Sequence, residues 1–487
     1  MSVPNCMRCL TRPSAVATAA LRPFTVPVSV SLTAAGRVAA FSTTPAQQAT
    51  PQKGSKTPAG RMDARIKRMA NGHVRVGKRL HVGGKKGGTR PKAPLPGERK
   101  AYRKRIQLSN SNALPVKDLA ELDGEHMLSE KNVAKVLSLP TAVIDQLRTV
   151  EAFKPTQTWG LFRDPSLLIR PETVDLMNRM QDSVANKQTL RLVIDGDKLT
   201  GKSILLLQAL TQAFLKDWIV INIPEAQELT AACTEYAPIP GTEPVQYMQQ
   251  VYILKLIQAI RKANEKVLSR LTTAYAHPEL PQHIPVSSPI LALANAAKEP
   301  DSAWTVFSAL WKELSSNIRG RPPILFALDG LHHIMKISKY RNAAFDLIHS
   351  HDLALIKLFT DYLSGQASLP NGGAIIAATS RNNCPVSASL ELALEQRLAT
   401  QNGEEPPAKK PYFKGYDSRV EGAMKSAQVL RIKGVSKLET RSLMEYWAAS
   451  GLLRTTVDEV AVSEKWMLGG NGVLGEMERA SLLTMRL

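Results

Sequence analysis

The sequence predicts an α/β fold in which helices cover both faces of a parallel β-sheet. Short apolar segments alternate with longer stretches of helical spacing, and turn residues separate them. Strands of a parallel sheet are buried on both faces, so they read as continuous apolar runs. A glycine-containing loop directly follows the first run, as expected where a strand leads into a helix. The five predicted strands are Leu190–Ile194, Trp218–Ile223, Ile324–Leu328, Ala374–Thr379 and Gln428–Ile432.

The loop reads GDKLTGKS at residues 196–203, which matches the phosphate-binding pattern G-x-x-x-x-G-K-[ST]. Its glycines let the backbone point several N–H groups at one spot, where the N-terminus of the next helix favours an anion. We therefore predict a P-loop NTPase core of the AAA-like type. A surface turn is the alternative, but the apolar run before the loop and the helical run after it disfavour it. The predicted nucleotide contacts are Gly196, Asp197, Lys198, Leu199, Thr200, Gly201, Lys202, Ser203 and Ile204.

Three side chains predict how the nucleotide would be held. Lys202 would contact the β- and γ-phosphates, and the Ser203 hydroxyl would join the shell of a Mg²⁺ ion. Asp329 ends the apolar run PPILFALDG, where a P-loop protein needs a carboxylate for the metal. An acid after an apolar run alone marks only a strand end, so this prediction depends on the loop upstream.

Fast hydrolysis is not predicted, and we assign no catalytic residue. Many NTPases that turn over quickly place a second acid beside the metal acid, whereas Gly330 follows Asp329 here. His332 or His333 would be able to orient a water, although such a pair is more often part of a packed or solvated loop. Polar residues after the fourth strand either face the γ-phosphate or simply form a turn. They are Thr379, Ser380 and Asn382.

Residues 245–271 are predicted to form one amphipathic helix. Apolar side chains recur every three or four positions from Ile253 to Leu271, which is the spacing of a helix face that packs on a core. Asn264 lies on this apolar face, where we expect it to make a satisfied polar contact.

A second helix begins near the C-terminus. Ser436 and Glu439 have the spacing of a capping box, and Gly451 suits the C-cap. A strand followed by this helical tail fits the small lid or winged-helix-like unit that follows many AAA-type cores. The predicted divisions are 106–185 for a lead-in helical segment, 186–385 for the P-loop core, 386–427 for a linker loop and helix, and 428–487 for the last strand and C-terminal helical unit.

Nearly all of the net charge lies before these segments. Residues 1–105 hold 22 Lys/Arg and two acids, so they contribute +20 of the formal +21. Residues 1–41 are rich in Ala, Ser, Thr and Val with isolated arginines, the composition of a mitochondrial presequence, with cleavage expected between residues 41 and 44. Prolines and arginines interrupt every apolar stretch there, which disfavours a secretory signal. The mature chain is therefore predicted to reach the mitochondrial matrix.

Cysteine and hydropathy patterns agree with this compartment. Cys6 and Cys9 have C-x-x-C spacing but lie in the piece expected to be removed. Cys233 and Cys384 then remain, too few for a disulfide framework. Because no stretch approaches the roughly 18 continuous apolar residues of a membrane-spanning helix, we predict no transmembrane segment.

Residues 42–105 form a basic, Gly/Pro-rich extension that cannot bury enough apolar surface to fold alone, so we expect it to be disordered. Its cations would order along a polyanion and release counterions, which favours RNA. A solvated linker or a lipid-binding segment is the alternative, although glycine and proline oppose the amphipathic helix that lipid favours. The predicted RNA contacts are Arg65, Lys67, Arg68, Arg75, Lys78, Arg79, Lys85, Lys86, Arg90, Lys92, Arg99, Lys100, Arg103, Lys104 and Arg105.

Five segments in this order resemble the death-associated protein 3 family, the P-loop nucleotide-binding proteins of the mitochondrial ribosome's small subunit, and suggest a fungal member. They are GDKLTGKS, DWIVINIPEA, PPILFALDGLHHI, IHSHDLALIKLF and SKLETRSLMEYWAASG. The resemblance covers residues 155–487. Leu199 departs from it, because many P-loops have a smaller residue at this position.

The resemblance implies a structural component of that subunit, which supports mitochondrial translation and carries GTP or GDP with Mg²⁺. ATP stays an alternative, because the N-K-x-D signature of ordinary GTPases does not occur. The implied partners are small-subunit rRNA and neighbouring ribosomal proteins, with no self-assembled ring.

Two other functions compete with this one. A mitochondrial AAA-type NTPase, acting as an assembly factor or RNA-dependent motor, predicts a second acid, an arginine finger from a neighbour and a ring. A nucleic-acid reader that uses the C-terminal helix predicts a basic helix. Lys437 and Arg441 are balanced there by Glu439 and Glu445, which disfavours a reader.

Overall fold

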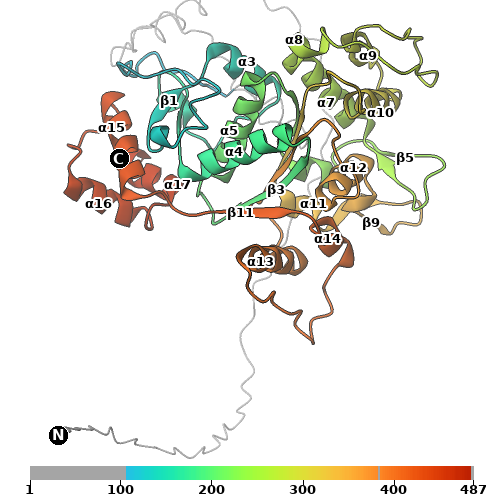
Figure 1. Ribbon diagram of the computed structural model, residues 1–487. Helices are drawn as coiled ribbons and strands as arrows, with labels where there is room; N and C mark the ends of the chain where they lie inside the picture. The colour runs from blue at the N-terminus through green and yellow to red at the C-terminus, as the bar shows by residue number, and fades with distance from the viewer. Residues whose placement is uncertain (1–105, 382–383, 484–487) are drawn as a thin grey trace, which may run out of the picture. The chain divides into compact units, whose positions relative to one another are not determined.

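A five-stranded parallel sheet organises the chain (Figure 1). The computed structural model describes residues 106–381 and 384–483. The strands lie in the order β11-β3-β10-β7-β4, so the strand before the glycine loop has β10 and β11 as neighbours. Their bounds are Thr189–Gly196 for β3, Ile219–Ile223 for β4, Ile324–Asp329 for β7, Gly373–Ala378 for β10 and Gln428–Ile432 for β11. These are the five predicted strands, and the predicted parallel sheet is confirmed.

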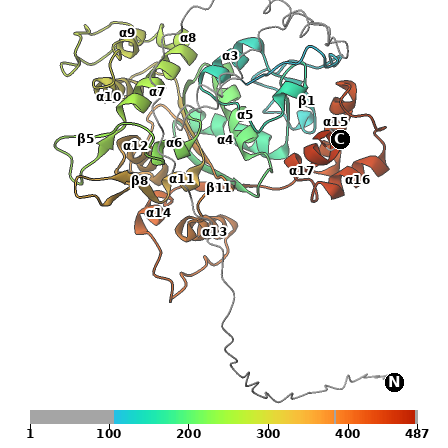
Figure 2. The same cartoon turned by 180° about the vertical axis from the view of Figure 1, so that it is seen from behind.

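Helices cover both faces of the sheet (Figures 1 and 2). Alternate residues of each strand enter different cores: Val220 and Leu325 pack on one face, and Ile221 and Phe326 on the other. The first core contains residues of α3 (Thr141–Thr149), α4 (Pro171–Ala185) and α5 (Lys202–Leu215). The second contains residues of α7 (Gln250–Ala263), α10 (Ala303–Leu314) and α12 (Ala354–Ser364). Burial on both faces explains why the strands are continuous apolar runs.

The predicted helix over 245–271 is wrong in its length. The structure has α7 and the short α8 (Glu265–Leu268), which are separated at Asn264. The Asn264 side chain accepts a hydrogen bond from the Val220 amide at 2.8 Å and donates one to the Val220 carbonyl at 2.9 Å. Asn264 therefore pairs with edge strand β4 as a neighbouring strand would, and the expected polar contact is confirmed. This pairing explains why the helix breaks where its apolar periodicity continues.

Smaller elements connect these layers. The lead-in segment contains η1 (Glu130–Asn132), η2 (Trp159–Leu161) and an antiparallel pair formed by β1 (Val136–Ser138) and β2 (Ser166–Leu168). The insertion after β4 contains α6 (Ala226–Thr230), β5 (Ala237–Pro238), β6 (Tyr247–Met248) and α9 (Ile290–Asn295). The others are α11 (Leu331–Ile334), β8 (Ile337–Arg341), β9 (Leu347–His349), η3 (Ser350–Asp352), α13 (Ala388–Asn402) and α14 (Ser418–Ala423).

The C-terminal unit consists of helices: α15 (Lys437–Ala449), α16 (Glu459–Leu468), α17 (Leu474–Glu478) and the terminal turn η4 (Arg479–Leu483). The predicted capping box is present, since the Glu439 carboxylate accepts from the Ser436 amide at 2.7 Å. Both views place these helices beside β1, and their apolar cluster includes Phe162 of the lead-in segment (Figures 1 and 2). Within the described residues this unit consists of helices and has no strand after β11, so it lacks the strands of a winged helix.

Several predictions lie outside the described residues. The presequence, the basic extension with all of its proposed RNA contacts, and Asn382 are among them. Among the residues that are described, no helix is both long and apolar enough to cross a membrane.

Candidate functional site

The loop between β3 and α5 lies at the carboxyl end of the sheet. Leu199 and Gly201 adopt left-handed backbone conformations, with φ of 65° and 100°. A Cβ atom at Gly196 would lie 2.6 Å from the carbonyl oxygen of Ile432 in β11. Packing therefore requires glycine at position 196, and the backbone conformation favours it at position 201. Leu199, the departure noted in the sequence, adopts the left-handed conformation without the freedom of glycine.

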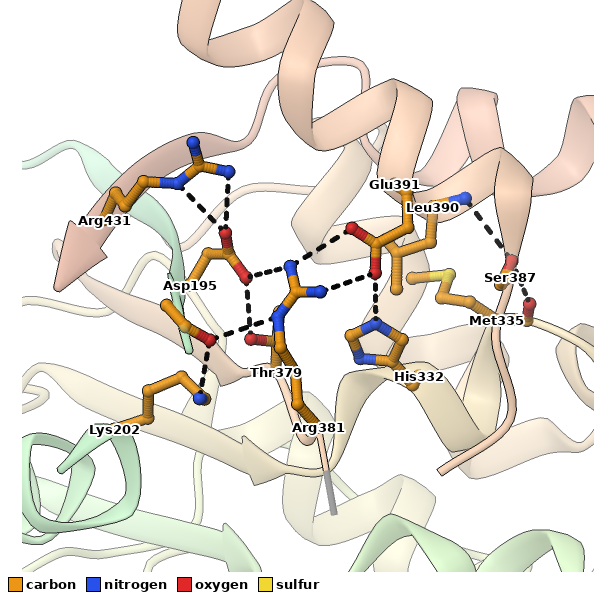
Figure 3. A network of polar contacts seen from close by, with 11 residues as sticks. Asp195, Lys202, His332, Met335, Thr379, Arg381, Ser387, Leu390, Glu391 and Arg431 are labelled. Carbon is orange, nitrogen blue, oxygen red and sulfur yellow. Dashed lines mark hydrogen bonds and ion pairs between the residues drawn. The ribbon is translucent and has the colours of Figure 1, made fainter. Parts of the chain in front are cut away.

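Lys202 begins α5, and its side chain folds back over the loop (Figure 3). Its ammonium donates hydrogen bonds to the carbonyl oxygens of Gly196, at 2.7 Å, and Asp197. Burial lowers the pKa of Lys202, although the carboxylate of Asp195 partly counteracts this effect. A cation is thus held inside the loop, where a P-loop lysine would meet phosphate oxygens.

The two residues predicted to hold a metal, Ser203 and Asp329, meet around one cation. The ammonium of Lys154 lies 3.2 Å from Ser203 Oγ and forms an ion pair with the Asp329 carboxylate. Hydroxyl and carboxylate oxygens are ligands that Mg²⁺ accepts, so this pair fits such an ion. In the part of the chain that the structure describes, no group of three or more His, Cys, Asp or Glu could hold a metal. Phosphate oxygens and water would have to complete the shell.

Thr379 and Ser380, two of the residues proposed to sense the γ-phosphate, both line the cavity beside the loop. Thr379 is 2% exposed, and its hydroxyl donates to Asp195 Oδ1 at 3.0 Å. The Thr379 hydroxyl would have to leave Asp195 before it could donate to a phosphate.

Sequence reasoning missed Asp195, a buried carboxylate that joins the ends of three strands (Figure 3). Besides Thr379 after β10, Asp195 of β3 binds Arg431 of β11, at 3.2 Å, and Arg381, at 3.4 Å. Burial alone would raise the pKa of Asp195. The hydrogen bond from Thr379, the charges of Arg381 and Arg431, and the Gly196 amide outweigh burial, so this pKa lies below its ordinary value. The carboxylate therefore stays charged and fixes the strand that leads into the loop.

Arg381 links Asp195 to the loop and to α13 (Figure 3). It donates to the Gly196 carbonyl at 3.2 Å and to both carboxylate oxygens of Glu391, at 3.1 and 3.2 Å. Glu391 also contacts His332, at 3.1 Å, and burial lowers the pKa of this histidine. His332 is thus a packed residue, which agrees with the sequence interpretation of a packed loop element. His333, in contrast, lines the cavity. The sequence contained one sign of this role: Arg381 is the one cation in the segment ATSRNN that follows the fourth strand.

A cavity of about 1010 Å³ adjoins the loop. Its polar end contains Lys154, Lys202, Ser203, Asp329 and Arg381. This end offers cations and metal-binding oxygens at the carboxyl edge of the sheet, where ligands of open α/β sheets bind.

The other end of the cavity is largely apolar and is shared with the C-terminal unit. Phe162 stacks on Tyr446, with ring centroids 5.2 Å apart, and Trp159, Leu443, Trp447 and Leu474 also line this end. Glu478 is the carboxylate here: burial raises its pKa to about 7, although Arg479 opposes the shift, and its carboxylate contacts the Thr158 hydroxyl. An apolar, aromatic region with a few polar groups, among them Glu478 and Thr158, suits a planar heterocycle.

Two further contacts at the cavity were not predicted. The Gly475 amide of α17 donates to the Leu199 carbonyl at 3.1 Å, which attaches the C-terminal unit to the loop. Glu225, just after β4, lines the same cavity as Asp329. Both were missed because their positions depend on how distant segments pack.

Comparison with known proteins gives a family and two relatives. The family model described as mitochondrial ribosomal death-associated protein 3 matches residues 167–480, more than half of the chain. A Neurospora crassa protein named small ribosomal subunit protein mS29 is 56% identical over 488 residues, which is 100% of each chain. A Schizosaccharomyces pombe protein of the same name is 25% identical over 351 residues, or 70% of each chain. The family match includes the loop, Asp329 and Glu478.

Proposed function

The chain belongs to the mitochondrial ribosomal death-associated protein 3 family, and we propose that it is a structural component of the small subunit of the mitochondrial ribosome that carries a bound nucleotide. Membership of this family places the protein in the mitochondrion. Within the subunit its partners would be rRNA and neighbouring ribosomal proteins, and its location would be the matrix.

One observation carries the nucleotide proposal. The loop lysine Lys202 and the pair Ser203–Asp329 border one cavity at the carboxyl edge of a parallel sheet. The loop would receive the phosphates, as in P-loop NTPases, and the apolar end would receive the base. Ser203 and Asp329 would form the cation position beside the phosphates, which Mg²⁺ or a protein ammonium is able to fill to neutralise phosphate charge.

Glu478 supports a guanine nucleotide, GTP or GDP. Guanine presents N–H donors at N1 and N2, and an ionised carboxylate accepts from both. Adenine presents an acceptor at N1, so it meets an ionised carboxylate unfavourably. The pKa of about 7 makes the ionised form of Glu478 available near neutral pH.

We also propose that residues 42–105 contact rRNA. The support is their charge, because 15 cations between Arg65 and Arg105 are interspersed with glycine and proline. Such a segment gains affinity for RNA by releasing counterions from phosphates.

The nucleotide would act mainly as a structural ligand. A ligand that binds only the folded chain stabilises it by about 2.7 kcal/mol at one hundred times its Kd. Lys202→Ala should therefore lose bound nucleotide and melt at a lower temperature, as measured by chromatography of nucleotide released on denaturation and by a thermal melt. Lys262→Ala, at an exposed position of α7, is the control. A variant that loses its nucleotide and keeps the wild-type melting temperature would contradict the structural role.

One observation favours the alternative, an NTPase. Glu225 reaches the cavity from the strand beside the one that ends at Asp329, and a carboxylate there is able to polarise a water. Steady-state GTP turnover that falls in Glu225→Gln, with nucleotide binding unchanged, would favour this function over a purely structural one.

A further inference from the structure

Lys154 is a lysine outside every sequence motif, and its ammonium lies where the predicted metal would bind. It contacts Ser203 Oγ at 3.2 Å and is ion-paired with Asp329. These are the two residues expected to coordinate Mg²⁺. The contacts therefore define one position for a cation, which this chain fills with its own side chain.

The turn that carries Lys154 is anchored. The Lys154 amide donates to Gln157 Oε1 at 2.8 Å, and the same oxygen accepts from the indole nitrogen of Trp159 at 2.6 Å. The preceding residue, Phe153, is 2% exposed and packs edge-to-face on Trp159 with centroids 5.4 Å apart. The backbone of Lys154 is thus fixed on the core, so its ammonium reaches the site without ordering a mobile segment.

Burial explains why a cation is needed here. The Asp329 side chain is 6% exposed, and a buried carboxylate without a partner is strongly destabilising. Lys202 is the other nearby cation, but its ammonium binds the loop carbonyls of Gly196 and Asp197. Lys154 therefore supplies the counter-ion of Asp329 among the described residues.

An ammonium has three N–H donors. Ser203 and Asp329 receive two of them in the contacts described above, and a third suffices for a phosphate oxygen. A P-loop metal makes the same kind of connection, because it links the hydroxyl, the strand carboxylate and the phosphates. A lysine carries one positive charge in place of two, but it is covalently attached and loses no hydration shell of a free ion.

We propose that Lys154 stands in for the divalent cation, so that this site binds a nucleoside diphosphate with little dependence on Mg²⁺. The proposal rests on the proposed nucleotide-binding function. Mg²⁺ would have to displace the Lys154 ammonium to reach Ser203 and Asp329, and removal of Lys154 makes these two ligands available to the metal.

The test is the affinity of the full chain for GDP, by isothermal titration, in excess EDTA and in excess Mg²⁺. The wild-type Kd for GDP should differ by less than about threefold between the two buffers. Lys154→Met should bind GDP at least about tenfold more weakly in EDTA, since it removes a hydrogen bond between charged groups. Mg²⁺ should restore most of this loss.

Three control variants keep the result interpretable. Lys262→Met removes an exposed lysine and should behave as wild type. Lys154→Gln keeps a polar group beside Asp329 if the methionine variant does not fold, and Lys154→Arg should keep the independence from metal. A wild-type protein that loses about tenfold or more in EDTA would overturn the proposal, and so would a Lys154→Met or Lys154→Gln variant that matches wild type in EDTA. A wild-type chain that binds GDP in neither buffer would instead refute the nucleotide-binding function.

Discussion

At the scale of one residue, burial sets the pKa of Glu478, the carboxylate that we propose contacts the base. Its carboxylate lies at the apolar end of the cavity, and burial raises its pKa from 4.5 to about 7. A folded-state pKa above the ordinary value stabilises the nucleotide-free fold at low pH. This contribution is lost as the pH rises from about 4.5 through 7, where the buried group must ionise. Guanine binding would lower the pKa of Glu478 again, because the N–H donors of the base favour the ionised carboxylate.

The preference of the wild-type chain for GDP over ADP should therefore increase from about pH 6 to about pH 8. Glu478→Gln should lower the preference at the higher pH by about tenfold or more, because a charge-assisted hydrogen bond is lost. It should also remove the pH dependence, since an amide does not titrate. Competition between the two nucleotides for the site, measured at both pH values, checks this prediction.

Glu476→Gln is the matched control. Glu476 is exposed on the same helix and pairs with Arg479 at 2.9 Å. It should leave both the preference and its pH dependence unchanged. A Glu478 variant that retains the wild-type preference for GDP over ADP would show that other residues recognise the base.

At this scale the loop side chains were predictable and their partners were not. Ser203 and Asp329 follow from a motif and a strand end, and the structure brings them around one cation. Lys154 and Arg381 belong to no motif, and they reach the loop through tertiary packing. Asp195 was missed because it directly follows the predicted strand Leu190–Ile194, where an acid by itself marks only a strand end.

Element boundaries were predictable where one physical signal dominates. Burial on both faces gave the five strands, and the capping box gave the start of α15. The helix over 245–271 failed because periodicity does not report a side chain that pairs with a strand, as Asn264 does with Val220. The placement of α17 against the loop is a long-range contact, so local sequence contains no signal for it.

The basic extension is the segment for which charge makes the clearest prediction. Deletion of residues 42–105 should weaken binding to small-subunit rRNA and flatten the dependence of log Kd on log salt, because each lost phosphate contact lowers the slope by about 0.7–0.9. Filter binding over a salt series measures both quantities. A full-length variant with the 15 proposed cations replaced by glutamine should match the deletion. An unchanged slope would mean that the extension is only a linker.

In the whole molecule, one cavity joins the core to the C-terminal unit. Lys202 and Asp329 come from the core, whereas Tyr446 and Glu478 come from the C-terminal helices. A nucleotide that fills this cavity would contact both parts, so its binding energy would hold them together. On the proposed function, this would be the physical reason for a ribosomal protein to retain a nucleotide that it turns over slowly or not at all.

The most direct test is the nucleotide content of this chain in small ribosomal subunits purified from mitochondria through a high-salt sucrose gradient. We expect the chain to migrate with the subunit after the salt wash and to release a stoichiometric amount of guanine nucleotide on denaturation. A chain found near the top of the gradient would contradict the structural role. A subunit-bound chain free of nucleotide would contradict the proposal that a bound nucleotide is part of its structure.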